Sequence, residues 1–236
     1  MFSSIAPLMY HSVSSDRDDP YHITVRPERL DRQLRWLHRL GRRGVSVGEL
    51  IEARSSGTGS HLVGLTFDDG YADFVDHALP TLRRYRFTAT VFVLAGRLGD
   101  ENAWNLKGPR KPLMTADQLR QVAAAGIEVG SHGLRHVSLP SVADDELTAE
   151  ISQSRRILQD ITGQDVAGFC YPYGHIDRRV VEGVQAAHYD YACAIWPSEF
   201  TGRYAIRRTY IRDSDSPPQL WAKGMWTSFK NSHRRR

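Results

Sequence analysis

Long apolar runs are missing from this chain of 236 residues. No stretch approaches the roughly 18 consecutive apolar residues of a membrane-spanning helix, so we expect no such helix. Residues 1–11 combine neither a basic start nor a long apolar segment, so we also expect no secretory signal peptide and a cytoplasmic location. Cysteine is scarce too. Cys170 and Cys193 are too few for a small disulfide scaffold, and their apolar neighbours predict two buried thiols.

Lysine is also rare, with only four residues, so arginine supplies most of the 31 basic side chains. The formal net charge is +4 and the pI is about 9.2, which raises the question of nucleic-acid binding. The arginines are scattered, apart from the tail Arg234–Arg236, and no nucleic-acid motif is present. We therefore expect no nucleic-acid partner and interpret the charge as a solvated surface.

The length and composition fit one soluble domain over residues 1–236 that ends in a short basic tail. Seven short β-like runs alternate with helical patterns, which favours parallel strands with helices outside. A closed or nearly closed α/β barrel is our first prediction, and an open doubly wound sheet is the second. The predicted strands cover residues 5–10, 62–67, 88–94, 127–130, 166–171, 189–195 and 205–211.

End signals mark four of the helices between these strands. Two glycines, Gly41 and Gly163, are expected to end the first and the third of them. The predicted starts are Pro27, the Thr115–Gln118 capping box, Ser141 and the Asp177 cap.

Two segments are predicted loops. Residues 54–61 form a Gly/Ser connector, whereas residues 96–114 are longer than an ordinary connection and are a candidate functional loop. Trp104 and Asn105 of the longer loop either line a sugar subsite, or the tryptophan pins the loop to the body of the protein.

The first chemical signal is the sequence TFDDG at residues 66–70, directly after an apolar strand. Carboxyl ends of parallel strands face the active site in barrels, and two adjacent carboxylates there repel unless their roles differ. One of Asp68 and Asp69 can bind a metal while the other accepts a proton. The alternative is a plain turn, because Asp-Gly is a common turn dipeptide.

The second signal is SHGLRH at residues 131–136, again after a strand. Histidines four apart, His132 and His136, lie on one face of a helical turn at a spacing that suits a divalent metal. Two histidines and one carboxylate leave positions open for water and substrate, as catalytic metal sites do. Taken alone, this spacing also occurs by chance.

Two further strand ends carry candidate residues. The turn YPYG at residues 171–174 can aim a backbone N–H at a developing oxyanion, or it simply ends the strand. His11 follows the first strand and can act as a general acid near neutral pH, or it is structural. His175 follows the turn and is a weaker candidate for the rim of the site.

Taken together in this order, TFDDG, SHGLRH and YPYG resemble the polysaccharide deacetylases with a NodB-homology domain, carbohydrate esterase family four. The resemblance runs from about Met9 to Ile211. The opening MYHSV and the segment LPTLRRYRFTATVFV look like the branch that contains poly-N-acetylglucosamine deacetylases. The resemblance implies a distorted (β/α)₇ barrel of the NodB-homology type. It also implies a metal-dependent hydrolase that removes N-acetyl groups from GlcNAc-type oligo- or polysaccharides and releases acetate.

The same resemblance implies roles for individual residues. Asp69, His132 and His136 match the metal ligands, and Asp68 matches the catalytic base. The metal is expected to be Zn²⁺, with Co²⁺ or Ni²⁺ able to substitute.

The resemblance also implies which residues contact the oxyanion and the sugar. Tyr173 matches the residue whose backbone N–H helps to hold the oxyanion. Tyr173, Pro172 and Trp104 are the expected substrate contacts, and a carbohydrate is the expected partner.

The chain departs from the family pattern at two places. The third motif usually carries an arginine that orients the base, but here Phe169, Cys170 and Tyr171 stand at that position. The late Leu-x-His that supplies the general acid is absent. The poly-N-acetylglucosamine branch looks similar in both respects, and there the histidine that matches His11 takes the place of the acid. An O-acetyl esterase, a small-glycoside deacetylase and a non-catalytic glycan-binding homologue remain alternatives.

Overall fold

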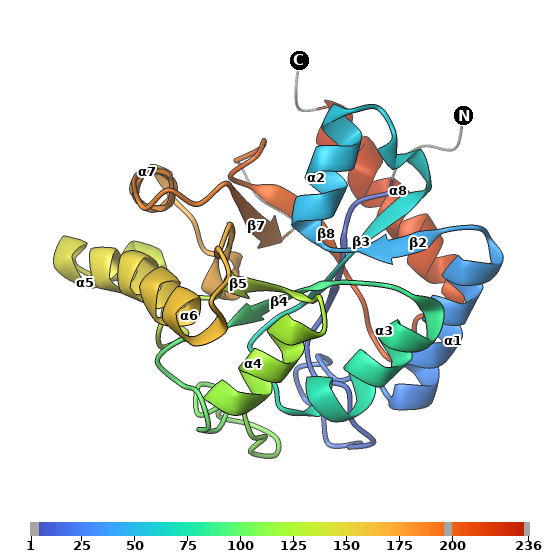
Figure 1. Cartoon of the computed structure of the whole chain (residues 1–236), viewed down its shortest axis with the longest axis horizontal. Helices are drawn as coiled ribbons and strands as arrows, with labels where there is room; N and C mark the ends of the chain where they lie inside the picture. Colours follow the sequence, from blue (N-terminus) through green and yellow to red (C-terminus); the bar gives the residue numbers. More distant parts are fainter. Residues whose placement is uncertain (1–4, 196–199, 234–236) are drawn as a thin grey trace.

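The computed structural model describes the backbone of residues 5–195 and 200–233 and the side chains up to residue 228, so the predicted basic tail lies outside it. Eight parallel strands follow the order β1-β8-β7-β6-β5-β4-β3-β2, and β1 also pairs with β3. That extra pairing closes seven strands into a barrel, as predicted (Figure 1). The strands are β1 Leu8–Tyr10, β2 Arg43–Val45, β3 Leu62–Phe67, β4 Thr90–Val93, β5 Glu128–Ser131, β6 Gly168–Cys170, β7 Tyr191–Ile195 and β8 Ile206–Tyr210.

The seven predicted strands are confirmed, each within about two residues at its ends except the first, which starts three residues later. Strand β2 was not predicted. It is only three residues long, too short for an alternating pattern, and it pairs with the first half of β3 while β1 pairs with the second half.

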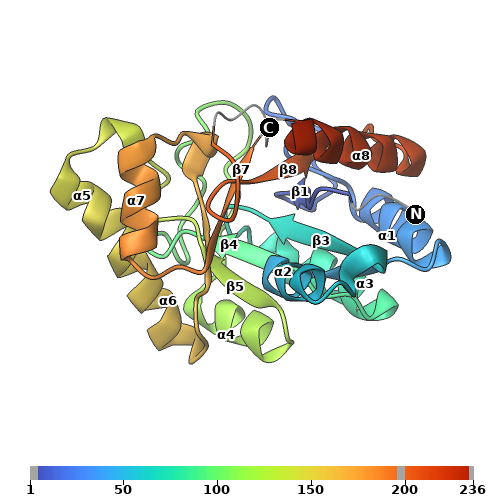
Figure 2. The same ribbon diagram turned by 90° about the horizontal axis from the view of Figure 1, so that it is seen from above.

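Helices surround the strands, as the view from above shows (Figure 2). Leucines at helical spacing in α1, Leu30, Leu34 and Leu37, are fully buried against the barrel, which is why this amphipathic segment is a helix. The helices are α1 Pro27–Arg39, α2 Val47–Ser55, α3 Leu79–Tyr85, α4 Ala116–Ala124, α5 Asp144–Thr148, α6 Ser154–Thr162, α7 Arg178–Ala186 and α8 Pro217–His233. None of them, over the residues described, is long and apolar enough to cross a bilayer.

Most of the predicted helix ends are confirmed. Thr115 and Gln118 exchange both bonds of the capping box, Asp177 accepts a bond from the third residue of α7, and Gly163 ends α6 at φ +65°. The predicted start at Ser141 is wrong. Ser141 closes a short 3₁₀ turn after Pro140, and α5 begins at Asp144.

Large side chains fill the inside of the barrel. Phe92 and Tyr191 pack there with Cys170 and Cys193, which are free, buried thiols as predicted. A side chain at Gly168 would come within 2.4 Å of the Tyr191 ring, so the close approach of the two strands requires glycine. Because the barrel interior is packed, a binding site can form only at an end, and the carboxyl ends of the strands carry the chemical motifs.

Candidate metal and catalytic site

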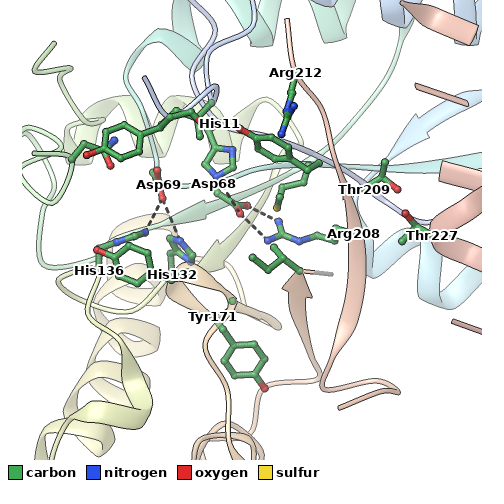
Figure 3. Close-up of a pocket in the computed structure, with 18 of the residues that line it drawn as sticks. His11, Asp68, Asp69, His132, His136, Tyr171, Arg208, Thr209, Arg212 and Thr227 are labelled. Carbon is green, nitrogen blue, oxygen red and sulfur yellow. Dashed lines mark hydrogen bonds and ion pairs between the residues drawn. The ribbon is translucent and has the colours of Figure 1, made fainter. Parts of the chain in front are cut away.

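The four motifs meet at one cavity of about 810 Å³ at the carboxyl end of the barrel. His11 follows β1, Asp68 and Asp69 follow β3, His132 follows β5, and Tyr173 lies in the turn after β6. Figure 3 shows Asp69 directed toward His132 and His136, and Asp68 directed toward Arg208 of β8. The parallel arrangement is the cause, since it places the end of every strand on the same side.

Asp69, His132 and His136 form the candidate metal centre. Asp69 Oδ1 lies 3.3 Å from His132 Nε2 and 3.4 Å from His136 Nε2, and all three residues are buried. Ligand atoms about 2.0–2.1 Å from a tetrahedral Zn²⁺ lie about 3.3–3.4 Å apart, so this spacing fits such an ion. Asp69 Oδ1 and His136 Nδ1 are buried without a well-formed hydrogen bond to any described residue, and a cation between the three groups would satisfy the carboxylate. The donor set of two imidazoles and one carboxylate therefore fits a divalent metal with open positions.

Electrostatics favour an ionised Asp69. Burial raises the pKa of this carboxyl, but its close contacts with the two imidazoles outweigh burial and hold the pKa well below its ordinary value. Asp69 is therefore an anionic candidate ligand at neutral pH.

The local backbone does not follow the predicted helical turn at His132 and His136. Residues 132–138 contain no helix, and His136 has φ +62°, in the left-handed region. Gly133, at φ +83°, turns the chain, so the imidazoles meet through a bend rather than through helical spacing. Asp69 also has a positive φ, of +72°, and such unusual conformations are concentrated at functional sites.

Three contacts fix the orientation of the histidines. His132 Nδ1 lies 2.7 Å from the carbonyl oxygen of Cys170. A carbonyl only accepts, so the proton is on Nδ1 and Nε2 is left to bind a metal. The His136 ring stacks on Trp104 at 4.6 Å between centroids and meets the edge of Tyr173 at 4.3 Å.

The long loop at residues 96–114 is anchored to the body and also lines the cavity. Asn105 donates a hydrogen bond to the Tyr71 hydroxyl at 3.1 Å, and Lys111 donates to Ser12 at 2.8 Å. Trp104 and Asn105 line the cavity. Trp104 thus holds the loop to the body through its contact with His136, and it also borders the cavity. That it lines a sugar subsite stays a prediction.

Asp68 is held by Arg208 of β8, a residue that the sequence analysis missed. Two guanidinium nitrogens donate to the two carboxylate oxygens at 2.6 and 2.7 Å, and both side chains are almost wholly buried. The same guanidinium donates to Thr66 at 2.9 Å and to the sulfur of Cys170 at 3.0 Å. Burial raises the pKa of Asp68, but the Arg208 charge outweighs it, so the pKa lies below its ordinary value.

Arg208 therefore reaches the carboxylate from β8, although the family pattern places an arginine at the end of β6, where Phe169, Cys170 and Tyr171 stand. A signal was present in the sequence. A basic side chain inside the apolar strand at residues 205–211 requires a buried partner. The partner is 140 positions away, which a local pattern cannot reveal.

A second group of possible ligands, Asp68, His132 and Cys170, is not a metal site. The Arg208 guanidinium already donates to both Asp68 and Cys170, and His132 Nδ1 is engaged by a carbonyl. A cation placed there would have to displace a buried arginine.

His11 stands beside Asp68, with Nε2 4.0 Å from a carboxylate oxygen, and Nδ1 is buried without a hydrogen-bond partner in the described part of the chain. The His11 side chain lines the cavity and is 15% exposed. The next residue, Ser12, donates to Asp73 at 2.5 Å and accepts from Lys111, so the segment that carries His11 is held on two sides.

The turn after β6 places its residues in different surroundings. Tyr173 is 45% exposed, lines the cavity and has φ +59°, whereas Pro172 is buried and is not part of the cavity wall. Hydrogen bonds from Gly174 N and His175 N close the turn without using the Tyr173 N–H. The exposed side chain of His175 bonds to Ser138 at 3.0 Å, away from the cavity wall.

Comparison with known proteins gives a consistent result. The family model described as polysaccharide deacetylase matches residues 55–192, more than half of the chain. YxkH of Bacillus subtilis, assigned to the polysaccharide deacetylases, is 25% identical over 86% of this chain and 70% of its own length. The poly-β-1,6-N-acetyl-D-glucosamine N-deacetylase of Staphylococcus aureus is 22% identical over 80% of this chain and 68% of its own. Among solved structures, the Streptococcus pyogenes deacetylase PplD superimposes with a TM-score of 0.79 at 23% identity, covering 95% of this chain and 99% of PplD.

Proposed function

The chain belongs to the polysaccharide deacetylase family, and from that premise we propose that it is a metal-dependent de-N-acetylase. Its substrate is an N-acetylated amino sugar of the GlcNAc type within an oligo- or polysaccharide, and its products are acetate and the free amine. The observation that carries the proposal is the trio of ligand atoms spaced 3.3 and 3.4 Å apart, beside a second carboxylate fixed by arginine. The Staphylococcus aureus relative is named for the N-deacetylation of such a polymer, which supports an N-acetyl amide rather than an O-acetyl ester as the bond that is cleaved.

Asp69, His132 and His136 would hold the metal, and Zn²⁺ is the ion whose preferred ligands and spacing they match best. Co²⁺ and Ni²⁺ accept the same donors. When bound, a divalent metal polarises the amide carbonyl and makes water more acidic.

The remaining steps belong to the side chains of the cavity. Asp68 accepts a proton from the attacking water, and Arg208 holds that carboxylate ionised and in a fixed orientation. The Tyr173 N–H donates to the oxyanion that forms on the acetyl carbonyl. His11 then donates a proton to the amine nitrogen as the C–N bond breaks, because an unprotonated amine is a poor leaving group.

The test is acetate release from chitooligosaccharides by purified protein supplied with Zn²⁺ or Co²⁺. Asp68→Asn should lower the rate by at least about 10²-fold while leaving the bound metal in place. Asp117→Asn, at an exposed position of α4, is the matched control and should behave like the unchanged protein.

Other substrates separate this proposal from its alternatives. Release of acetate from acetylxylan but not from chitooligosaccharides would identify an O-acetyl esterase. Sugar binding without any acetate release would identify a non-catalytic glycan-binding protein. Either result would overturn de-N-acetylation.

A further inference from the structure

The cavity extends well past the reacting centre. Besides the ligands and the base, its wall includes Lys223, Trp226 and Thr227 of α8. Figure 3 places Thr209 and Thr227 beyond Arg208, on the side away from His132. Helix α8 lies outside residues 55–192, the part matched by the family model. The sequence motifs at the strand ends therefore assign no role to the residues at the α8 end of the cavity.

Exposed aromatic side chains gather along the cavity. Six large hydrophobic side chains of the described chain are exposed, and three of them line this one cavity: Tyr21 at 39%, Tyr173 at 45% and Trp226 at 60%. Aromatic rings that border a cavity and also carry a polar group suit ligands with both apolar and polar faces. A sugar ring is such a ligand, because its C–H groups form an apolar face and its hydroxyls surround the edge.

Polar groups that could bind hydroxyls are present at the same end. Thr209 lines the cavity and is 3% exposed, and its buried hydroxyl has no hydrogen-bond partner among the described residues. A buried hydroxyl without a partner is unfavourable, so a ligand hydroxyl there would be stabilising. Arg212 also lines the cavity, with its guanidinium 5.6 Å from the centre of the Tyr210 ring and available for hydrogen bonds at the rim.

We propose that the α8 end of the cavity is a distal sugar subsite. The indole of Trp226 packs against a sugar ring of the substrate chain other than the one that is deacetylated, and Thr209 and Arg212 bond its hydroxyls. The inference rests on the proposed function and sharpens it. The enzyme acts on a chain long enough to reach α8, and a monosaccharide fills only part of the cavity.

The test is the dependence of kcat/KM on chain length, from N-acetylglucosamine to its hexamer. With the unchanged protein, kcat/KM should rise with length. Trp226→Ala should lower it about 3- to 10-fold for the longer chains, the usual effect of losing one aromatic contact, and leave the monomer unchanged. Met225→Ala is the matched control, since Met225 is 42% exposed on the same helix but does not line the cavity.

Two results would overturn the subsite. One is an equal fall of kcat/KM at every length with Trp226→Ala, and the other is the same fall with Met225→Ala. If the unchanged protein releases no acetate at all, the proposed function fails, but the subsite is still judged by calorimetric binding of the hexamer. Weaker binding in Trp226→Ala alone supports it, and equal affinity of all three proteins overturns it.

Discussion

Replacing Arg208 by methionine should damage both folding and catalysis. The substitution keeps an unbranched side chain but removes the guanidinium and with it the two hydrogen bonds, of 2.6 and 2.7 Å, that hold the buried Asp68 carboxylate. Breaking a buried ion pair on one side costs about 3–5 kcal/mol, since the other charge is left uncompensated. For a chain of this size that corresponds to a fall in Tm of roughly 6–20 °C.

Activity should fall as well, by about 10²–10⁴-fold, because Asp68 loses the group that keeps it oriented and charged. The assays are thermal unfolding and acetate release on the same metal-loaded samples. Arg120→Met is the matched control. Arg120 also pairs with an aspartate, Asp117, but on the surface of α4, where such a pair contributes at most about 1 kcal/mol.

A double variant separates loss of the pair from loss of the side chain. Combining Arg208→Met with Asp68→Asn removes both charges. The double variant should therefore lose about 1–3 kcal/mol less unfolding free energy than the sum of the losses in the two single variants. Activity should stay low, because the base is absent. An unchanged Tm and rate in Arg208→Met, or strict additivity in the double variant, would refute the role of this ion pair.

Three further results are expected. Alanine at any one of the three metal ligands should abolish stoichiometric metal binding measured by mass spectrometry, and one bound ion per chain in all three variants would disprove the assignment. His11→Ala should slow de-N-acetylation about 10²–10⁴-fold but slow hydrolysis of an aryl acetate far less, because an aryloxide leaves without a proton; equal losses would indicate a different role. Burial raises the pKa of Asp31, but hydrogen bonds from Tyr85, Arg35 and Arg84 outweigh it and lower the pKa. The stabilisation is therefore present above the ordinary pKa of about 3.9 and lost as pH falls through the folded value. Asp31→Asn should cost up to about 1 kcal/mol in urea unfolding at pH 7 and progressively less as the pH is lowered below about 3.9, and a pH-independent difference would contradict this.

Much of the site could be predicted because each motif is local. A buried strand followed by carboxylates, by two histidines or by a Pro-Tyr-Gly turn can be recognised within about ten residues. Once the strands are parallel, their carboxyl ends lie together, and Asp69, His132 and His136 meet as a consequence.

The sequence by itself determined the alternating strands and helices, most helix ends and the positions of the chemical groups at strand ends. Capping, amphipathic spacing and turn chemistry depend on neighbours a few residues apart, so they can be recognised in one sequence. Only the tertiary structure decided that β1 closes on β3, that His136 turns through a left-handed bend, and that Arg208 of β8 binds Asp68. The physical reason is that these contacts join segments far apart in the chain. A charged residue within an apolar strand predicts that a buried partner exists, but the packing of the whole barrel determines which residue that partner is.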